Sequence, residues 1–367
     1  MTRSSANASS ASPVRVVVVS DSLPERNGVG AYYVDLLSQL EEHDFDCTLL
    51  CPRADRGLIR FPLPGDATQH VYLPSPMRVS RIIKNANPQI IVVATPGPFG
   101  MLGARWSRRL KVPLLVGFHT HYAGVTDVYR NAIFRNLSRA YFQYVDRLLF
   151  RTATQVLGNS DEMIELARSL GGKKVERIGT LLPQPVLKTP LQPHRGQIQR
   201  VLYAGRLAPE KRVLHVLETA EQMPDIEFAI AGDGPLRAEV HKATERLDNV
   251  TSLGWLTRDQ LLEHMDWCDA LVMPSTLESF GTVALEAMAR GRIALVTDTS
   301  GIVNWPELRE QLVVFSLETP LADVLSTLAS NAPDAIQKQA DASAKAAHQL
   351  NQASLEHWMA LLRRHAE

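Results

Sequence analysis

Short apolar runs alternate with amphipathic stretches through the first half of the chain. Residues 14–19, VRVVVV, form a β-branched run too apolar for a strand with one face in water, so they predict a central strand covered on both faces. Further strands are predicted at 47–51, 89–93, 113–118 and 154–157. Amphipathic helices are predicted between them, at 30–42, 99–110 and 128–151. Strands and helices that alternate at these lengths are typical of a parallel sheet wound on both faces.

The alternation stops at residues 183–200, PQPVLKTPLQPHRGQIQR, which hold four prolines and no helical period. This stretch predicts a linker, placed at 186–199. The series then resumes, with strands predicted at 200–204, 227–231, 270–273 and 292–296 and helices at 209–222, 236–247, 259–266 and 282–290. Two doubly wound domains, 14–185 and 200–346, are therefore predicted to face each other across a cleft, and such folds bind ligands at the carboxyl ends of their sheets.

Both ends of the chain differ from this pattern. Residues 1–13 contain one arginine and no apolar segment, so they predict a disordered tail and not a signal peptide. Beyond residue 320 the chain is alanine-rich and helical in pattern. Its last part, 347–367, carries an apolar stripe that needs a surface to cover it, made of Leu355, Trp358, Met359 and Leu362.

Length and composition narrow the class of protein. At 367 residues the chain exceeds the roughly 100–200 residues of a usual domain, which agrees with two domains. Hydrophobic residues make up 45% and charged residues 21%, as in an ordinary soluble protein, and no apolar run approaches the ~20 residues of a membrane span. The cysteines, Cys47, Cys51 and Cys268, form no paired framework. A reducing cytoplasm is therefore expected.

Charge is distributed unequally between the two halves. Residues 1–185 contain 22 basic and 15 acidic side chains, a net charge of +7, and the remaining residues contain 17 basic and 24 acidic ones, a net charge of −7. The basic half indicates either a membrane surface or anionic acceptor as partner, or an arginine-rich surface that is simply solvated. Helix 128–151 has an apolar face that includes Leu137, Tyr141 and Tyr144. Its candidate membrane or acceptor residues are Arg135, Arg139, Arg147 and Arg151.

The stretch 277–291, LESFGTVALEAMARG, lies between two apolar runs and predicts a tight turn followed by a helix. Glu278 lies in the turn, and Glu286 lies one turn inside the helix. The unpaired N–H groups and the dipole of a helix N-terminus favour a phosphate, and an acid one turn further holds hydroxyls beside it. A sugar nucleotide has both kinds of group. In isolation the two glutamates are also consistent with a loop carboxylate and a solvated helix residue.

A second turn, 204–211 with the sequence AGRLAPEK, follows the predicted strand 200–204. It places Arg206 and Lys211 around the start of the next helix. Two cations at a helix N-terminus neutralise a departing diphosphate, the guanidinium through its planar donor fork and the ammonium as a point charge. In isolation they are also consistent with two solvated surface cations.

The first strand is followed by a glycine turn, DSLPERNGVG at 21–30. Gly28 and Gly30 allow the backbone to approach a phosphate at the start of the following helix. The turn is not a dinucleotide fingerprint, because Tyr33 occupies the position of its third glycine.

Two histidines, His119 and His121, follow the strand 113–118 and should lie in the cleft. A His-x-His pair without a third ligand nearby does not predict a metal site. The sequence DFD at 44–46 is a literal DxD motif. Because it lies in a polar turn, it does not predict a metal site either. We therefore expect neither a metal nor another cofactor.

Together, these segments resemble retaining glycosyltransferases of family 4, an α/β family with the GT-B fold of two doubly wound, Rossmann-like domains that face each other across a cleft. Glu278 and Glu286, with seven residues between them, resemble the EX7E segment, and GRLAPEK at 205–211 resembles the diphosphate loop. NGV at 27–29 and FHTH at 118–121 are closest to the sulfoquinovosyl and glycolipid branch. One departure is SGIVNW at 300–305, where a Gly-Gly-x-x-Glu is common.

The resemblance implies a role for each candidate residue. The catalytic candidates are His119 and Glu278, which contact the transferred sugar, and Arg206 and Lys211, which stabilise the departing diphosphate. Glu286 binds the ribose, and the other donor-binding candidates are Asn27, Gly28, Val29, Gly205, Gly232, Gly234, Ser279, Phe280, Gly281 and Thr282. His121 is a candidate on the acceptor side. In this fold the last helix crosses between domains, so we expect 347–367 to pack back toward the N-terminal domain.

The sequence therefore predicts a retaining glycosyltransferase that moves a hexose-type sugar from a nucleotide-sugar donor to a hydroxyl. A UDP-sugar is favoured as donor, with GDP-mannose as the second class. The expected acceptor is a membrane lipid such as diacylglycerol, reached by peripheral binding at the anionic cytoplasmic face of the inner membrane, and no nucleic acid is expected as partner. The alternatives are a soluble or polysaccharide-precursor acceptor, a sugar-nucleotide epimerase that needs no acceptor, and an inactive nucleotide-sugar-binding protein.

Overall fold

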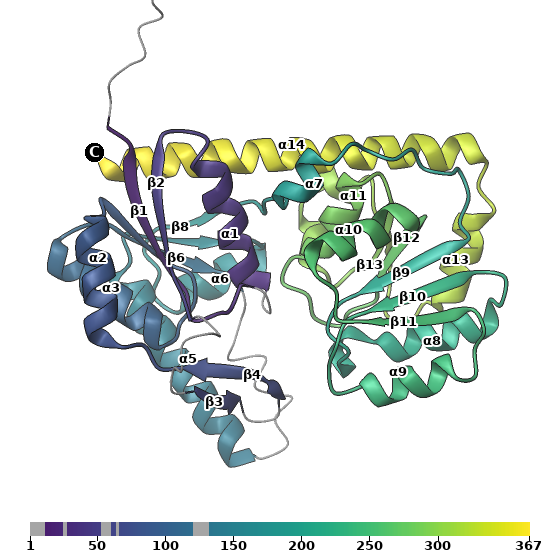
Figure 1. Cartoon of the computed structure of the whole chain (residues 1–367), viewed down its shortest axis with the longest axis horizontal. Helices are drawn as coiled ribbons and strands as arrows, with labels where there is room; N and C mark the ends of the chain where they lie inside the picture. The colour runs from purple at the N-terminus through teal and green to yellow at the C-terminus, as the bar shows by residue number, and fades with distance from the viewer. Residues whose placement is uncertain (1–11, 25–27, 53–59, 64–65, 120–131) are drawn as a thin grey trace, which may run out of the picture.

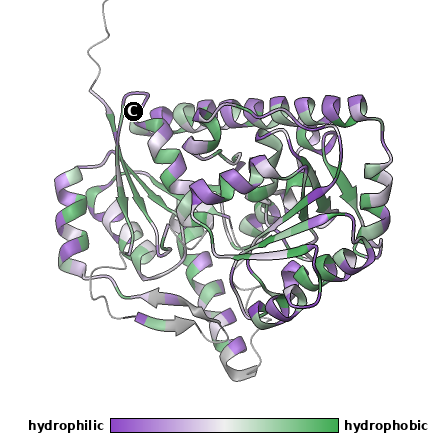
Figure 2. Ribbon diagram, turned by 45° about the vertical axis from the view of Figure 1, so that its right-hand side comes forward, coloured by the Kyte–Doolittle hydropathy of each residue, from purple (hydrophilic) through white to green (hydrophobic). Residues whose placement is uncertain are grey.

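A computed structural model describes residues 12–24, 28–52, 60–63, 66–119 and 132–367 of the chain. It contains two six-stranded parallel sheets, each with helices on both faces, and one long C-terminal helix runs along both of them (Figure 1). The strands of both sheets are mostly hydrophobic, whereas polar residues gather on the outer helices (Figure 2). The predicted fold of two doubly wound α/β domains is therefore confirmed.

The N-terminal sheet has the strand order β2-β1-β5-β6-β7-β8. The strand β1 (Val14–Val19) is central, as its sequence predicts, because Val16 and Val18 pack on one face of the sheet and Val17 and Val19 on the other. The other strands are β2 (Phe45–Leu50), β5 (Ile90–Val93), β6 (Leu114–Phe118), β7 (Gln155–Gly158) and β8 (Val175–Arg177). The helices are α1 (Gly28–Leu40), α2 (Pro76–Ala86), α3 (Pro98–Leu110), α5 (Ala132–Thr152) and α6 (Asp161–Ser169). An antiparallel hairpin, β3 (Arg60–Leu63) and β4 (Asp66–Tyr72), stands apart from the sheet (Figure 1).

The C-terminal sheet has the strand order β11-β10-β9-β12-β13-β14. Its strands are β9 (Arg200–Ala204), β10 (Glu227–Ala231), β11 (Val250–Gly254), β12 (Ala270–Met273), β13 (Ile293–Thr297) and β14 (Val313–Phe315). Its helices are η2 (Pro209–Lys211), α8 (Val213–Gln222), α9 (Arg237–Thr244), α10 (Arg258–Trp267), α11 (Thr282–Ala289), η3 (Gly301–Asn304), α12 (Pro306–Arg309) and α13 (Leu321–Ala329). Successive residues of β9 again enter opposite cores, which is why the strand is apolar throughout.

The long helix α14 (Pro333–Ala366) serves both domains. Ala347 and Leu350 pack in the C-terminal core, and Leu355 and Trp358 pack in the N-terminal core. Trp358 is fully buried, and its indole N–H donates to the hydroxyl of Tyr32 at 2.7 Å. The apolar stripe near the end of the chain is thus covered by the N-terminal domain. It belongs to one continuous helix and does not form a separate helix from residue 347.

Two predicted elements differ from the structure. The predicted helix 209–222 is broken, because Arg212 adopts a left-handed conformation with φ of +53° between η2 and α8, and its Nη1 donates to the carbonyl of Leu317 at 3.1 Å. The predicted linker begins inside a short helix, α7 (Gln184–Lys188). The sequence did not predict this helix, because the stretch is rich in proline. Proline at the first turn is compatible with a helix, because the N–H that it lacks has no partner there.

Candidate active site

The turn at 277–282 lies at the carboxyl end of β12 and is pinned by the loop after β13. The N–H of Gly301 donates to the carbonyl of Glu278 at 2.9 Å, and that of Ile302 donates to the carbonyl of Phe280 at 2.8 Å. Gly281 precedes α11 with φ of +104°, and a Cβ there would lie 2.5 Å from Cε of Met273, so this position requires glycine. The loop that departs from the family pattern therefore fixes the turn that carries Glu278 and Ser279.

Two cations from the neighbouring turn converge on this point. Lys211, at the end of η2, forms an ion pair with Glu278, and both side chains are half-buried. Nη1 of Arg206 donates to Oε1 of Glu210 at 3.1 Å, and the carbonyl of Glu210 accepts the N–H of Thr276 at 2.8 Å. The turn after β9 and the turn after β12 are thus joined. Three of the predicted catalytic residues, Arg206, Lys211 and Glu278, share this edge of the C-terminal sheet.

Packing explains why two of the donor-binding candidates, Gly232 and Gly234, are glycines. A Cβ on Gly232 would lie 1.8 Å from the carbonyl oxygen of Gly205, and one on Gly234 would lie 2.5 Å from the carbonyl oxygen of Leu207. The N–H of Leu207 donates to the carbonyl of Asp233 at 3.0 Å. These contacts hold the loop after β10 against the turn that carries Arg206. Residue size alone therefore accounts for glycine at 232 and 234, whatever they contact in a ligand.

Glu286 lies one turn inside α11 and is half-buried. Burial raises the pKa of its carboxyl from 4.5 to about 7. The positive charge of Arg258 lowers this pKa, and the negative charge of Asp35 raises it further. Thr282, the first residue of the same helix, is also half-buried, and Phe280 in the preceding turn is fully buried. Glu286 is therefore poised to change its charge near neutral pH.

Asp35 and Arg258 form an ion pair that the sequence did not predict. Asp35 lies on α1 of the N-terminal domain, and Arg258 begins α10 of the C-terminal domain. Both guanidinium nitrogens Nη1 and Nη2 donate to the carboxylate, the second at 2.7 Å to Oδ2. The one available signal was an aspartate inside the apolar segment of α1, where it is 3% exposed.

His119 lies at the end of β6 and is buried among aromatic rings. Its Nε2 lies 3.0 Å from the hydroxyl of Tyr33, and its ring centroid lies 4.7 Å from that of Tyr32. Burial lowers the pKa of the imidazole to about 4, so the ring is neutral at physiological pH. Two of the donor-binding candidates of the N-terminal domain lie at the start of α1, where Gly28 is exposed and Val29 is buried. The predicted residues Asn27 and His121 lie outside the described residues.

A small cavity of about 10 Å³ is lined by His119, at the end of β6, and by residues of α5. Asp146 of α5 lines it together with Phe118 and Val29. This aspartate is 1% exposed, and its Oδ2 has no hydrogen-bond partner among the described residues. Burial raises the pKa of the carboxyl to about 7. A buried carboxylate oxygen without a hydrogen-bond partner is unusual, and nothing in the sequence marked it.

The helix α5 exposes the apolar residues that its sequence pattern placed on one face. Leu137 is 64% exposed, Tyr141 46% and Tyr144 65%. Of the arginines on this helix, Arg135 and Arg139 are half-buried, while Arg147 and Arg151 are exposed. The first half of the helix projects from the domain beside the hairpin β3–β4 (Figure 1). The apolar residues of this face therefore do not belong to the core, although their helical spacing resembles that of core residues.

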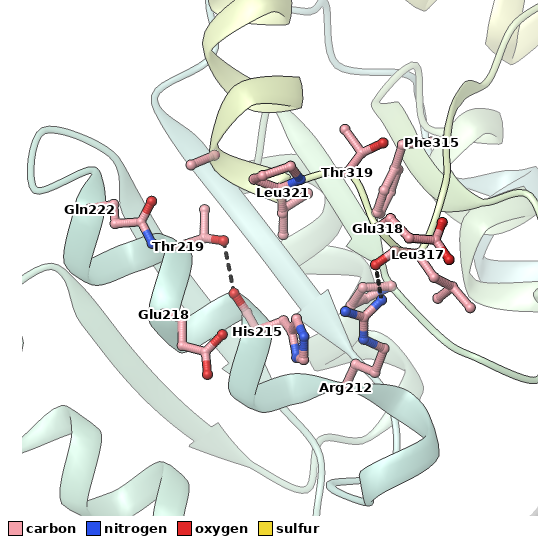
Figure 3. A pocket seen from close by; sticks show the side chains of 13 residues that line it. Arg212, His215, Glu218, Thr219, Gln222, Phe315, Leu317, Glu318, Thr319 and Leu321 are labelled. Carbon is pink, nitrogen blue, oxygen red and sulfur yellow. Dashed lines mark hydrogen bonds between the residues drawn. The ribbon is translucent and has the colours of Figure 1, made fainter.

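A separate pocket of about 270 Å³ lies between α8 and the loop 315–322 (Figure 3). Arg212, His215 and Glu218 from one side face Phe315, Leu317 and Glu318 from the other. No residue predicted for the donor site lines it. The bond from Arg212 to the carbonyl of Leu317 crosses it, so the pocket lies beside the candidate site and not within it.

Two classes of feature are absent from the described residues. No three His, Cys, Asp or Glu side chains in that part of the chain lie close enough together to hold a metal ion. No helix among the same residues has the length and apolar character to cross a bilayer.

Two family models match successive parts of the chain. The model for "Glycosyltransferase Family 4" matches residues 26–180, and the model for "Glycosyl transferases group 1" matches residues 192–314. The first covers most of the N-terminal domain, with His119, and the second covers the C-terminal residues of the candidate site.

Curated relatives and solved structures agree with these models. A "GDP-mannose-dependent alpha-mannosyltransferase" of Mycobacterium tuberculosis is 26% identical over 78% of this chain and 80% of its own length. "Sulfoquinovosyl transferase SQD2" of Arabidopsis thaliana is 23% identical over 67% of this chain and 50% of its own length. Among solved structures, sucrose-phosphate synthase of Thermosynechococcus elongatus superposes with a TM-score of 0.70 at 17% identity, covering 96% of this chain and 99% of that one. Anabaena HepE in complex with UDP gives a TM-score of 0.65 at 18% identity, covering 95% and 100%. With its two-domain fold and both halves matched, the chain belongs to the family 4 glycosyltransferases of the GT-B fold.

Proposed function

We propose that this protein transfers a hexose from a nucleotide-sugar to a hydroxyl acceptor with retention of the anomeric configuration. The observation that carries the proposal is the ion pair of Lys211 with Glu278, in the turn that leads into α11, with Arg206 held by Glu210 in the same turn as Lys211. The relatives named for GDP-mannose and the structure containing UDP support a nucleotide-sugar as donor.

The donor diphosphate would replace a carboxylate as the partner of Lys211. In the structure Glu278 neutralises this ammonium, and a diphosphate carries more charge and more acceptor oxygens than a carboxylate. Its binding would free Glu278 to accept hydrogen bonds from hydroxyls of the sugar. Arg206, Lys211 and the N–H groups at the start of α11 would then stabilise the charge that develops on the leaving diphosphate.

The N-terminal domain would hold the sugar with uncharged groups. The imidazole of His119 is neutral and oriented by Tyr33, so it can exchange a hydrogen bond with a sugar hydroxyl without changing its own charge. Asp21 is occupied by the N–H groups of Gly97, Phe99 and Gly100 at 2.7–3.1 Å. Asp146 is buried. Neither Asp21 nor Asp146 is therefore placed to attack the sugar. We therefore favour departure and attack on one face of the sugar over double displacement.

A UDP-sugar is the first donor to test and GDP-mannose the second. The experiment measures release of UDP from UDP-glucose and of GDP from GDP-mannose, with and without vesicles that contain diacylglycerol. We expect release that depends on the vesicles and a product with the anomeric configuration of the donor. Epimerised donor in the absence of acceptor would favour the epimerase alternative, and binding without any product would favour the inactive protein.

For the acceptor, we propose a membrane lipid that the protein reaches through α5. Exposed Leu137, Tyr141 and Tyr144 suit insertion at the boundary between headgroups and acyl chains, and arginines of the same helix suit an anionic surface. Each Arg or Lys near such a surface contributes about 1 kcal/mol. Binding at the cytoplasmic face of the inner membrane would therefore be peripheral, reversible and sensitive to salt.

Vesicle sedimentation tests this surface directly. The protein should sediment with anionic vesicles at low salt and be released as ionic strength passes ~0.1–0.2 M. Replacing Arg135, Arg139, Arg147 and Arg151 by Gln should weaken this binding at least about tenfold without changing donor affinity. The matched control removes the same charge from α2, α3 and α6, by replacing Arg81, Arg105, Arg108 and Arg168. If the two sets weaken binding equally, or if only soluble acceptors are glycosylated, the α5 surface is not the acceptor side.

A further inference from the structure

The ion pair between Asp35 and Arg258 joins the two domains across the candidate donor site. The helices α1 and α10 that carry these residues face each other between the two sheets (Figure 1). The carboxylate is 5% exposed and the guanidinium 39%. In comparison, the interdomain pair of Lys188 and Glu42 has both side chains in solvent. A buried carboxylate loses more than an exposed one when its partner is removed, because water does not replace the partner.

The backbone of Arg258 is held in place by the cap at the start of α10. Thr257 and Gln260 form a reciprocal capping box, in which Gln260 N–H donates to the Thr257 hydroxyl at 3.3 Å and Thr257 N–H donates to the Gln260 amide oxygen at 3.0 Å. Arg258 is therefore held as the first residue of α10. From there its guanidinium reaches Asp35 and its charge acts on Glu286.

We propose that Asp35 and Arg258 are positioning residues, which hold the two domains together beside Glu286 and thereby govern its grip on the ribose of the donor. This inference rests on the proposed donor role of Glu286. Neither residue touches the reacting atoms. They act by fixing the separation of the domains and by placing one charge of each sign near the Glu286 carboxylate.

The two residues have opposite electrostatic effects on Glu286, which separates this role from a purely structural one. Without the guanidinium charge the carboxyl is more difficult to ionise, so the pKa of Glu286 should be higher in R258Q than in D35N. D35N instead removes a repulsion and leaves the charge of Arg258 to act on Glu286 alone. Arg258 and Asp35 are the charged groups that act on Glu286 in the described part of the chain. An ionised carboxylate accepts both ribose hydroxyls, so donor affinity should rise with pH through the pKa of Glu286.

The decisive experiment measures the dissociation constants of UDP-glucose and GDP-mannose by calorimetry between pH 5.5 and 9. The midpoint of the pH dependence should lie at least about one pH unit higher in R258Q than in D35N, because both variants separate the domains and differ in the charge that remains near Glu286. Interdomain distance, measured by energy transfer between labels on the two domains, should increase in both variants. The exchange D35R/R258D should restore the distance. The matched control is the exposed pair Glu221 and Arg246, whose replacement by Gln should change neither quantity.

The outcomes distinguish this inference from the proposed function. Equal midpoints in the two variants, or a higher midpoint in D35N, overturn the role of the pair in donor binding. An unchanged interdomain distance in both single variants overturns its role in holding the domains, and the exchange variant keeps this test valid if a single variant folds poorly. If the wild-type protein binds neither nucleotide-sugar, the proposed function fails, while the distance measurement still decides whether the pair joins the domains.

Discussion

Asp146 offers a test of the buried surroundings of His119 that needs no substrate. The carboxyl lies in a cavity of about 10 Å³, which is close to the space that one water needs, and Oδ2 has no protein partner among the described residues. The perturbation is D146N, which keeps the shape of the side chain and removes its ability to ionise. The exposed residue Asp225 supplies the control, D225N, in which the same atoms change in solvent.

The expected effect follows from the difference in pKa between the folded and unfolded chain. Burial raises the pKa of Asp146 from 3.8 to about 7 in the folded protein. Below pH 4 the acid is protonated in both states and has no effect. As pH rises from 4 to 7 the unfolded chain releases the proton first, so the wild-type protein loses stability and then remains lower. At about 1.36 kcal/mol per pH unit the loss reaches at most about 4 kcal/mol, and D146N should escape it.

Chemical denaturation at pH 4.5 and pH 8 measures this difference, with a fluorescence signal from the N-terminal domain because the two domains need not unfold together. D146N and wild type should have similar free energies of unfolding at pH 4.5, and D146N should be more stable at pH 8. D225N should follow the wild type at both values. If D146N and wild type lost stability in parallel between these values, the carboxyl would not be desolvated and the cavity would be open to water.

Other expectations concern the chemistry. E286A and R206A should each lower transfer on the order of 100-fold or more while leaving thermal unfolding nearly unchanged. Wild-type turnover at saturating donor in either variant would show that the replaced residue does not belong to the site. Transfer should be unaffected by excess EDTA, because Arg206 and Lys211 supply the positive charge that the diphosphate needs, and a loss that added Mg²⁺ restores would contradict this assignment.

The sequence predicted the parts of the fold that depend on local pattern. Strands such as β1 and β9 were recognised because both faces of a central parallel strand are buried and every residue is apolar. The hairpin β3–β4 was missed, because RFPL and DATQHVY lie close to prolines and carry no regular alternation. The break at Arg212 was missed for a different reason. Its left-handed conformation accompanies a bond to Leu317, 105 residues away, which no local pattern contains.

In the candidate site, too, the residues in local motifs were predicted and those that depend on distant contacts were not. The turns that carry Arg206, Lys211 and Glu278 are continuous segments with family spellings, and the structure joins the two turns through the ion pair of Lys211 with Glu278 and the bond from Thr276 to Glu210. Asp35 and Arg258 are 223 residues apart, and neither lies in such a segment. A pair of this kind is fixed by the meeting of two domains, so a single sequence gives no direct signal for it.

Three cations of the candidate site are paired with carboxylates of the protein itself. Lys211 is neutralised by Glu278, Arg206 by Glu210, and Arg258 by Asp35. A diphosphate that enters such a site exchanges one set of ion partners for another, so the desolvation of the cations has largely taken place before it arrives. The ribose end differs, because no described residue forms an ion pair with Glu286 and its carboxyl has a pKa of about 7. Diphosphate binding should therefore depend little on pH near neutrality, and the pH dependence of donor affinity should come from the ribose end, where the two domains meet.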